Sequence, residues 1–116
     1  MMDPQHRLFL ECAWQALESA GYAAGRCPGP VGVFGGVSRD NYRAVLIASG
    51  ALADLEGSRL AALGTHVDFL TSRVSYKLGL EGPSFDVQAA CASSMVAVHL
   101  ACQSLQAGEC AMALAG

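Results

Sequence analysis

The sequence predicts an α/β fold in which buried, parallel strands alternate with helices. Three short runs bounded by turn residues have the length and pattern of strands, at residues 31–37, 84–88 and 110–114. Apolar residues at helical spacing precede the first run and separate the others. Because strands that alternate with helices form parallel sheets with helices on both sides, we expect both faces of this sheet to be covered.

The first predicted helix covers residues 4–20. Asp3 is a typical N-cap, and Pro4 suits the first position of a helix. Apolar residues then recur at spacings of three and four and predict one buried face: Leu10, Ala13, Trp14, Leu17 and Ala20. Gly21 is expected to end the helix.

The run VGVFGGV at residues 31–37 predicts a buried strand because it is rich in valine and bounded by turn residues. Its glycines Gly32, Gly35 and Gly36 do not follow the pattern G-x-G-x-x-G, and no G-K-[ST] comes after them. A phosphate-binding loop is therefore not expected. These glycines indicate positions where another backbone approaches the strand closely.

The middle of the chain carries weaker signals. Residues 41–47 predict a short helix, and the Ala, Gly and Ser residues of 48–64 predict a flexible surface excursion. Residues 67–78 predict a helix with one apolar side formed by Phe69, Leu70, Val74 and Leu78. A turn at 80–83 then leads into the strand at 84–88.

The last third predicts a helix followed by a strand. Residues 93–105, SSMVAVHLACQSL, are apolar almost all round, which indicates a helix buried on most of its sides. Gly108 is expected to end this helix before the last buried strand at 110–114.

Composition limits the classes of function. The chain has 116 residues, 53% hydrophobic and only 15% charged, whereas soluble domains carry roughly 25% charged residues. Much of its surface is therefore expected to face protein, either within a larger domain or against a partner. The net charge is −3 with no basic run, which argues against nucleic-acid binding. The sequence contains no apolar stretch of membrane-spanning length and no signal-peptide pattern. We therefore expect no membrane-spanning segment and a cytoplasmic location.

The five cysteines form no C-x-x-C pair and no zinc-ligand spacing, so no metal site is expected and free thiols are predicted. They are Cys12, Cys27, Cys91, Cys102 and Cys110. A buried, structural role is the simplest explanation for Cys102, which lies mid-helix, and for Cys110 at the start of a strand.

Cys91 lies where a predicted strand turns through small residues into a helix. Unpaired N–H groups and the positive end of the helix dipole favour a thiolate there, and the same N–H groups can hold an oxyanion. This arrangement is typical of a nucleophile elbow with sulfur in place of a serine oxygen. A core cysteine at the same position remains an alternative.

The three histidines are poorly placed to assist Cys91 as general bases. His6 is predicted in the first turn of an exposed helix, and His66 precedes a helix. His99 lies two turns beyond Cys91 on the same predicted helix, too far along it for its ring to reach back. None of the three is expected to be catalytic.

The segment VQAACASSMVAVHLACQSLQAGECAMALAG at residues 87–116 resembles the active-site region of beta-ketoacyl synthase (ketosynthase) domains of modular type I polyketide synthases. The segments DPQHRLFLECAWQALESAGY, VGVFGGVSRDNY and DFLTSRVSYKLGLEGPSFDVQ resemble the parts that come before it. The resemblance implies a thiolase-like fold, here the first half of its layered αβαβα architecture. It also implies that residues 1–116 are an N-terminal part of the domain, truncated at both ends.

The resemblance implies that Cys91 accepts an acyl chain from an acyl carrier protein as a thioester, with its backbone N–H in the oxyanion hole. Decarboxylative Claisen condensation with a malonyl-type carrier protein then lengthens the chain. No cofactor is implied, because substrates arrive on the phosphopantetheine arm of the carrier protein. A homodimer is the family's usual assembly.

Three departures from the family are visible. The family's two catalytic histidines belong to motifs beyond Gly116, its opening strand lies before Met1, and Ala89 and Ala92 stand where Thr and Ser are common. The chain alone is therefore expected to be inactive in condensation. Two alternatives stay open: a discrete 3-oxoacyl-carrier-protein synthase of fatty acid biosynthesis, and a non-catalytic dimer-interface or pseudo-ketosynthase piece.

Overall fold

The fold was obtained as a computed structural model that describes residues 2–23, 25–38 and 42–116. Its α-helices are α1 (Pro4–Ser19), α2 (Tyr42–Ala48), α3 (Leu55–Thr65), α4 (Leu70–Leu78) and α5 (Ser93–Gln106). The strands are β1 (Val31–Gly35), β2 (Ser84–Asp86) and β3 (Met112–Ala115), and two 3-10 turns, η1 (Val67–Phe69) and η2 (Ala90–Ala92), precede α4 and α5.

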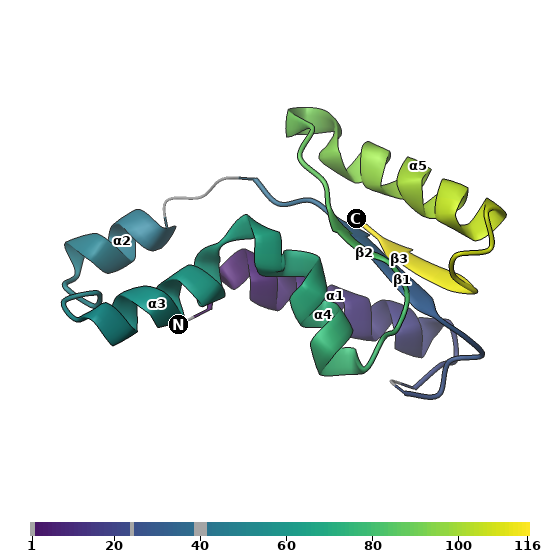
Figure 1. The fold of residues 1–116 in the computed structure, drawn as a ribbon, viewed down its shortest axis with the longest axis horizontal. Coiled ribbons are helices and arrows are strands. Elements are labelled where there is room, and N and C mark those ends of the chain that lie inside the picture. Colours follow the sequence, from purple (N-terminus) through teal and green to yellow (C-terminus); the bar gives the residue numbers. More distant parts are fainter. Residues whose placement is uncertain (1, 24, 39–41) are drawn as a thin grey trace.

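The three strands form one parallel sheet in the order β2-β1-β3. Helix α5 lies on one side of this sheet, and α1 and α4 lie on the other (Figure 1). Helices α2 and α3 project away from the sheet as an arm (Figure 1). The predicted α/β class is confirmed, and every residue of the central strand β1 is buried.

Helix α1 begins and ends where the sequence predicts. The Asp3 side chain accepts a hydrogen bond from the backbone N–H of Gln5 at 2.7 Å, and a proline occupies the first turn. Gly21 takes a left-handed φ of 85°, and its N–H bonds the carbonyl of Glu18, which closes the C-terminus. Trp14 was expected on the buried face but is 46% exposed, because Ala13 and Leu17 are the positions that meet the sheet.

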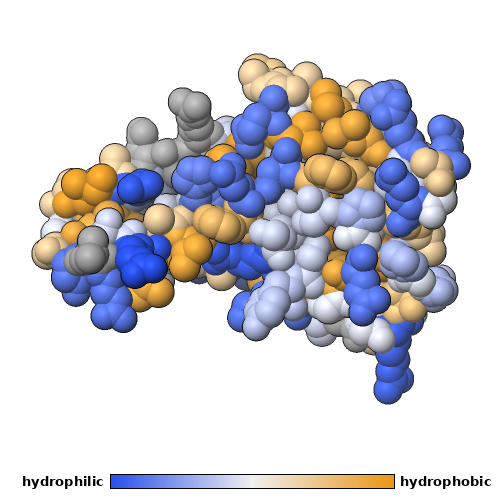
Figure 2. All heavy atoms as spheres, viewed as in Figure 1, coloured by the Kyte–Doolittle hydropathy of each residue, from blue (hydrophilic) through white to orange (hydrophobic). Residues whose placement is uncertain are grey.

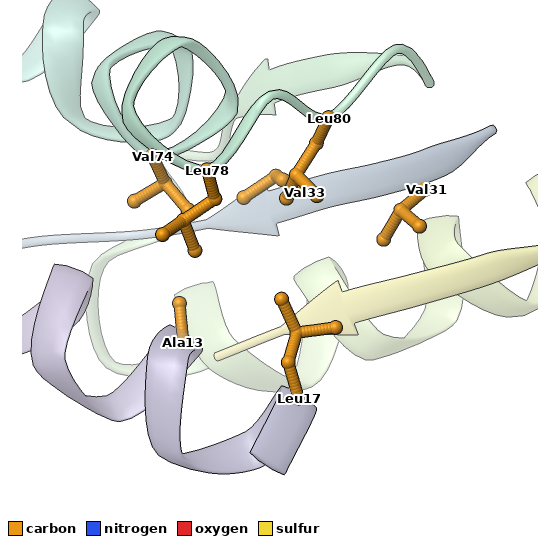
Figure 3. Packing of buried hydrophobic residues seen from close by; sticks show 7 residues of the cluster. All are labelled: Ala13, Leu17, Val31, Val33, Val74, Leu78 and Leu80. Atoms are coloured by element: carbon orange, nitrogen blue, oxygen red, sulfur yellow. The ribbon is translucent and has the colours of Figure 1, made fainter. Parts of the chain in front are cut away.

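The main core lies between β1 and the two helices on its α1 side (Figure 3). Its buried members are Ala13, Leu17, Val31, Val33, Val74, Leu78 and Leu80. Figure 3 shows Val74 and Leu78 of α4 pointing toward Leu17 and Ala13 of α1, with the β1 valines beside them. Phe69 was predicted on this side of α4 but is half-exposed, since it belongs to η1 rather than to the helix.

Helix α5 packs on the opposite face of the sheet through Ala97 and Ala101, which meet Phe34 and Val87. Its outer side carries exposed apolar residues, with Met95 74% exposed and Val98 and Leu105 also exposed. Figure 2 shows this apolar surface over α5 among hydrophilic residues. The prediction that α5 is buried on most of its sides is wrong for this chain, because only its sheet-facing side meets other described residues.

The segment 48–64 was predicted to be a flexible excursion, and the structure instead contains helix α3 there. The Asp54 side chain caps α3 by accepting a hydrogen bond from the N–H of Gly57. Ala61 is fully buried, which anchors the helix, and its larger apolar side chains Leu60 and Leu63 are exposed. The capping aspartate was the available signal, and the surrounding Ala, Gly and Ser residues obscured it.

The glycines of β1 were predicted to let another backbone approach, but the groups nearest to Gly32 and Gly35 are aromatic side chains. A Cβ on Gly35 would lie 2.4 Å from the Phe9 ring, and a Cβ on Gly32 would lie 2.8 Å from the Phe34 ring. Close approach of neighbouring groups therefore explains these glycines. Within the described residues, no helix is both long and apolar enough to cross a membrane.

Candidate active site

The carboxyl ends of the three parallel strands meet next to the start of α5. The N–H of Gly36, just after β1, donates to the carbonyl of Gly116 after β3 at 2.9 Å. The N–H of Val87, just after β2, donates to the carbonyl of Gly35 at 2.8 Å. Binding crevices of open α/β sheets form at this end of the strands.

Cys91 lies at this end, inside the turn η2 between β2 and α5, and its side chain is exposed. Residues Ala89 and Ala92 occupy the N-cap positions of η2 and α5 and have no polar side chain with which to cap them. The backbone N–H groups of the first turn of α5 and the positive end of its dipole therefore lie within a few residues of Cys91 in the chain. The predicted strand–turn–helix setting of Cys91 is present.

The turn before Cys91 has an unusual backbone. Ala90 has a φ of 49°, and among the described residues it is the one non-glycine residue with a positive φ. The Ala92 N–H bonds the Ala89 carbonyl at 3.0 Å, and the Gln88 side chain donates to the Val37 carbonyl at 3.3 Å. The sharp bend of the predicted elbow is thus located one residue before the cysteine.

Ser93, in the first turn of α5, contacts this bend from the C-terminal side. Its hydroxyl accepts a hydrogen bond from the Ala89 N–H at 2.9 Å and donates one to the Ala90 carbonyl at 2.9 Å. From the sequence, Ser93 was expected only as one of the small residues that leave room for a thioester carbonyl beside Cys91. A serine in the first turn of a helix was the only signal, and it did not indicate which backbone groups the hydroxyl would reach.

Asp86, the last residue of β2, fixes the strand that leads to Cys91. Its carboxylate accepts a hydrogen bond from the Thr71 N–H at 3.0 Å, and Ser84 donates to the Thr71 hydroxyl at 3.0 Å. Burial raises the pKa of Asp86, while the hydrogen bonds from Thr71 oppose that rise. These contacts join β2 to the first turn of α4.

The other cysteines occupy different environments. Cys12 on α1 and Cys102 on α5 are exposed, Cys27 is half-buried and Cys110 is buried. The structural interpretation of Cys110 is supported by its burial, but the expectation of a buried Cys102 is wrong, because Cys102 lies on the outer side of α5. Cys12 and Cys102 are therefore exposed thiols that lie within helices and not at the start of one.

The three histidines occupy different parts of the structure. His6 was expected on an exposed helix but is 1% exposed, because it lies with Asp3 on the buried side of the first turn of α1, whereas Pro4 and Arg7 are exposed. His66 lies beside Asp68, with Nδ1 3.2 Å from Oδ2. His99 is exposed on α5, eight residues and about 12 Å along the helix axis from Cys91. Across the described parts of the chain, no three His, Cys, Asp or Glu side chains gather into a metal-binding group.

Comparison with known proteins gives one consistent result. The model of the family described as "Beta-ketoacyl synthase, N-terminal domain" matches residues 1–116. A phenolphthiocerol/phthiocerol polyketide synthase protein of Mycobacterium tuberculosis is 46% identical over all of this chain, which covers 8% of that protein. The polyketide synthase ThaG of Burkholderia thailandensis is 50% identical over 99% of this chain, which covers 2% of it.

Solved structures agree with the sequence comparison. Ketosynthase twelve of the bacillaene polyketide synthase from Bacillus amyloliquefaciens superposes with a TM-score of 0.84 at 34% identity, over 93% of this chain and 18% of that one. The ketosynthase from module 6 of the bacillaene synthase from Bacillus subtilis superposes with a TM-score of 0.78 at 35% identity, over 98% of this chain and 18% of that one. These likenesses confirm the predicted thiolase-like fold, and the chain spans less than a fifth of each of these relatives.

Proposed function

The chain belongs to the beta-ketoacyl synthase family, and from this membership we propose that Cys91 is the acyl-accepting nucleophile of a polyketide ketosynthase. The observation that carries the proposal is the exposed Cys91 thiol at the carboxyl ends of three parallel strands, immediately before α5. The named relatives are polyketide synthases, which favours polyketide over fatty acid biosynthesis.

The first proposed step is thioester exchange. The Cys91 sulfur attacks the carbonyl carbon of an acyl thioester on the phosphopantetheine arm of an acyl carrier protein. The carbonyl oxygen becomes an oxyanion, which the backbone N–H of Cys91 and other N–H groups near the start of α5 stabilise. The bond to the carrier sulfur then breaks, the carrier thiolate takes a proton, and the acyl group remains on Cys91.

The second proposed step is condensation. A malonyl-type thioester on a carrier protein loses carbon dioxide, and the resulting carbanion attacks the Cys91 thioester. A carbon–carbon bond forms, the Cys91 thiolate leaves, and the chain has grown by two carbons. In the family this step uses two histidines from motifs beyond Gly116, and His99 lies about 12 Å along α5 from Cys91. We therefore propose that residues 1–116 alone do not condense.

The partners proposed for the whole domain are the acyl carrier protein, its acyl and malonyl-type thioesters, and a second copy in a homodimer. A cofactor of its own is not proposed, because the phosphopantetheine arm brings the substrate. The five free thiols fit a reducing compartment, and we propose the cytoplasm as the location.

Acyl transfer to the chain tests the proposal. The 116-residue chain is incubated with an acyl phosphopantetheine thioester, and modified peptides are identified by mass spectrometry. We expect acylation at Cys91, none after Cys91→Ala, and little at the exposed thiols Cys12 and Cys102. Equal acylation of the three exposed thiols would contradict the proposal, and so would extended product formed from malonyl carrier protein by the chain alone.

The exposed apolar side of α5 supports a second candidate, a non-catalytic piece that contributes an interface. Iodoacetamide or cerulenin labelling separates the two candidates. The nucleophile proposal expects Cys91 to react faster than Cys12 and Cys102, which are also exposed. The interface candidate expects Cys91 to react no faster than they do.

A further inference from the structure

The bend that presents Cys91 has a backbone conformation that its own residue does not favour. Ala90 has a φ of 49°. In this left-handed region the Cβ of an L-residue crowds the following carbonyl oxygen, so residues other than glycine rarely stay there without support. Such a conformation persists when surrounding contacts hold it in place.

Ser93 supplies contacts on both sides of the bend. Its hydroxyl receives a hydrogen bond from the Ala89 N–H, before Ala90, and gives one to the carbonyl of Ala90 itself, each at 2.9 Å. These two bonds span the residue with the unfavourable φ. Any change of φ at Ala90 would move the two groups apart and break at least one of the bonds.

The sheet in turn holds Ser93. A Cβ on Gly36 would lie 2.7 Å from the Ser93 Cβ and 2.8 Å from the Val87 carbonyl oxygen, closer than side chains approach. Gly36 therefore leaves only the room that Ser93 needs, directly after β1. Backbone hydrogen bonds from Gly36 to Gly116 and from Val87 to Gly35 keep this end of the sheet fixed.

We propose that Ser93 is a positioning residue for Cys91, whose hydroxyl holds Ala90 in the left-handed conformation and so sets the direction of the Cys91 side chain and of the N–H groups beside it. Ser93 acts through the backbone and does not itself react with the acyl group. The inference rests on the proposed function of Cys91 and adds to it the group that keeps the nucleophile presented.

A double-mutant cycle on the 116-residue chain tests the inference. The variants are Ser93→Ala, Ala90→Gly and the double variant, with Ser94→Ala as the control because Ser94 is an exposed neighbouring serine. The rate of Cys91 alkylation by iodoacetamide is measured by peptide mass spectrometry relative to Cys102 on the same helix. A fall of about 5- to 30-fold is expected for Ser93→Ala, the factor that corresponds to the backbone penalty of a left-handed alanine.

Glycine at position 90 should remove the need for the hydroxyl, because glycine adopts positive φ without that penalty. We therefore expect Ser93→Ala to have little effect in the Ala90→Gly background, and Ser94→Ala to have little effect in either. An equal loss from Ser93→Ala in both backgrounds would overturn the inference, and so would no loss in the original chain. If Ser93→Ala alone does not fold, the Cys91 alkylation rate of the double variant is compared with that of Ala90→Gly. Equal rates are expected, and a slower double variant would overturn the inference.

A second measurement separates this inference from the proposed function. The Cα and Cβ chemical shifts of Ala90 report its φ by nuclear magnetic resonance and do not depend on the reactivity of Cys91. We expect Ser93→Ala to move these shifts away from left-handed values, and unchanged shifts would overturn the inference. If Cys91 of the original chain reacts no faster than Cys102, the proposed function fails, whatever the shifts of Ala90 show.

Discussion

Replacing Gly36 by alanine tests how the end of β1 supports the candidate site. The new Cβ would lie 2.7 Å from the Ser93 Cβ and 2.8 Å from the Val87 backbone oxygen, and the second of these atoms cannot rotate away. Overpacking of this kind costs about 1 to 3 kcal/mol. For a domain of this size, that cost corresponds to a fall in Tm of roughly 5 to 20 °C.

The assay is thermal unfolding followed by circular dichroism, with Cys91 alkylation measured on the folded protein. Gly116→Ala is the matched control, because its Cβ would lie 3.9 Å from the Phe9 ring, an ordinary contact distance. We expect Gly36→Ala to lower both the Tm and the Cys91 rate, since it displaces Ser93. Equal Tm values and equal Cys91 rates for the two variants would refute the reasoning.

Four further substitutions test other parts of the fold. Leu17→Ala, at a side chain 2% exposed in the main core, should lower the free energy of unfolding by about 2 to 5 kcal/mol, measured by urea denaturation. Met95→Lys on the outer side of α5 should change it by less than about 0.5 kcal/mol, whereas Ala97→Leu on the buried side should cost about 1 to 3 kcal/mol. Asp86→Asn should become more stable relative to the original chain as the pH rises from about 3 to 7. The folded-state pKa of Asp86 is raised above 3.8, so its contribution to stability is present below that pH and is lost as the pH rises through the raised value; a pH-independent difference would contradict this.

The parts of the fold that could be predicted are those whose signals lie close together in the sequence. Asp3, Pro4 and Gly21 mark the ends of α1, and the valines of β1 mark a buried strand. Helix α3 could not be recognised, because its cap at Asp54 precedes residues that are also common in loops. The exposure of Met95 and Val98 could not be predicted from an apolar helix, since composition does not say how many of its sides are covered.

The candidate site also has features that could be predicted from the sequence and features that could not. The place of Cys91 between a strand and a helix follows from local pattern, and the structure has it there. The positive φ of Ala90 and the hydrogen bonds of Ser93 occur where Ser93 packs against Gly36, which lies far away in the sequence. A contact between residues far apart in the sequence leaves no periodic pattern of apolar residues. The contact between Ser93 and Gly36 could therefore not be predicted from the sequence.

The strand order has a consequence for how the chain acquires its structure. The central strand β1 is synthesised first, whereas its partners β2 and β3 follow much later, with Val31 paired to Met112. Parallel pairing between such distant segments requires closure of long loops and slows folding. On the ribosome, the fully buried Val33 must therefore wait for Leu114, its partner in β3, to emerge. During that interval the apolar strand β1 has unpaired edges that are open to incorrect pairing.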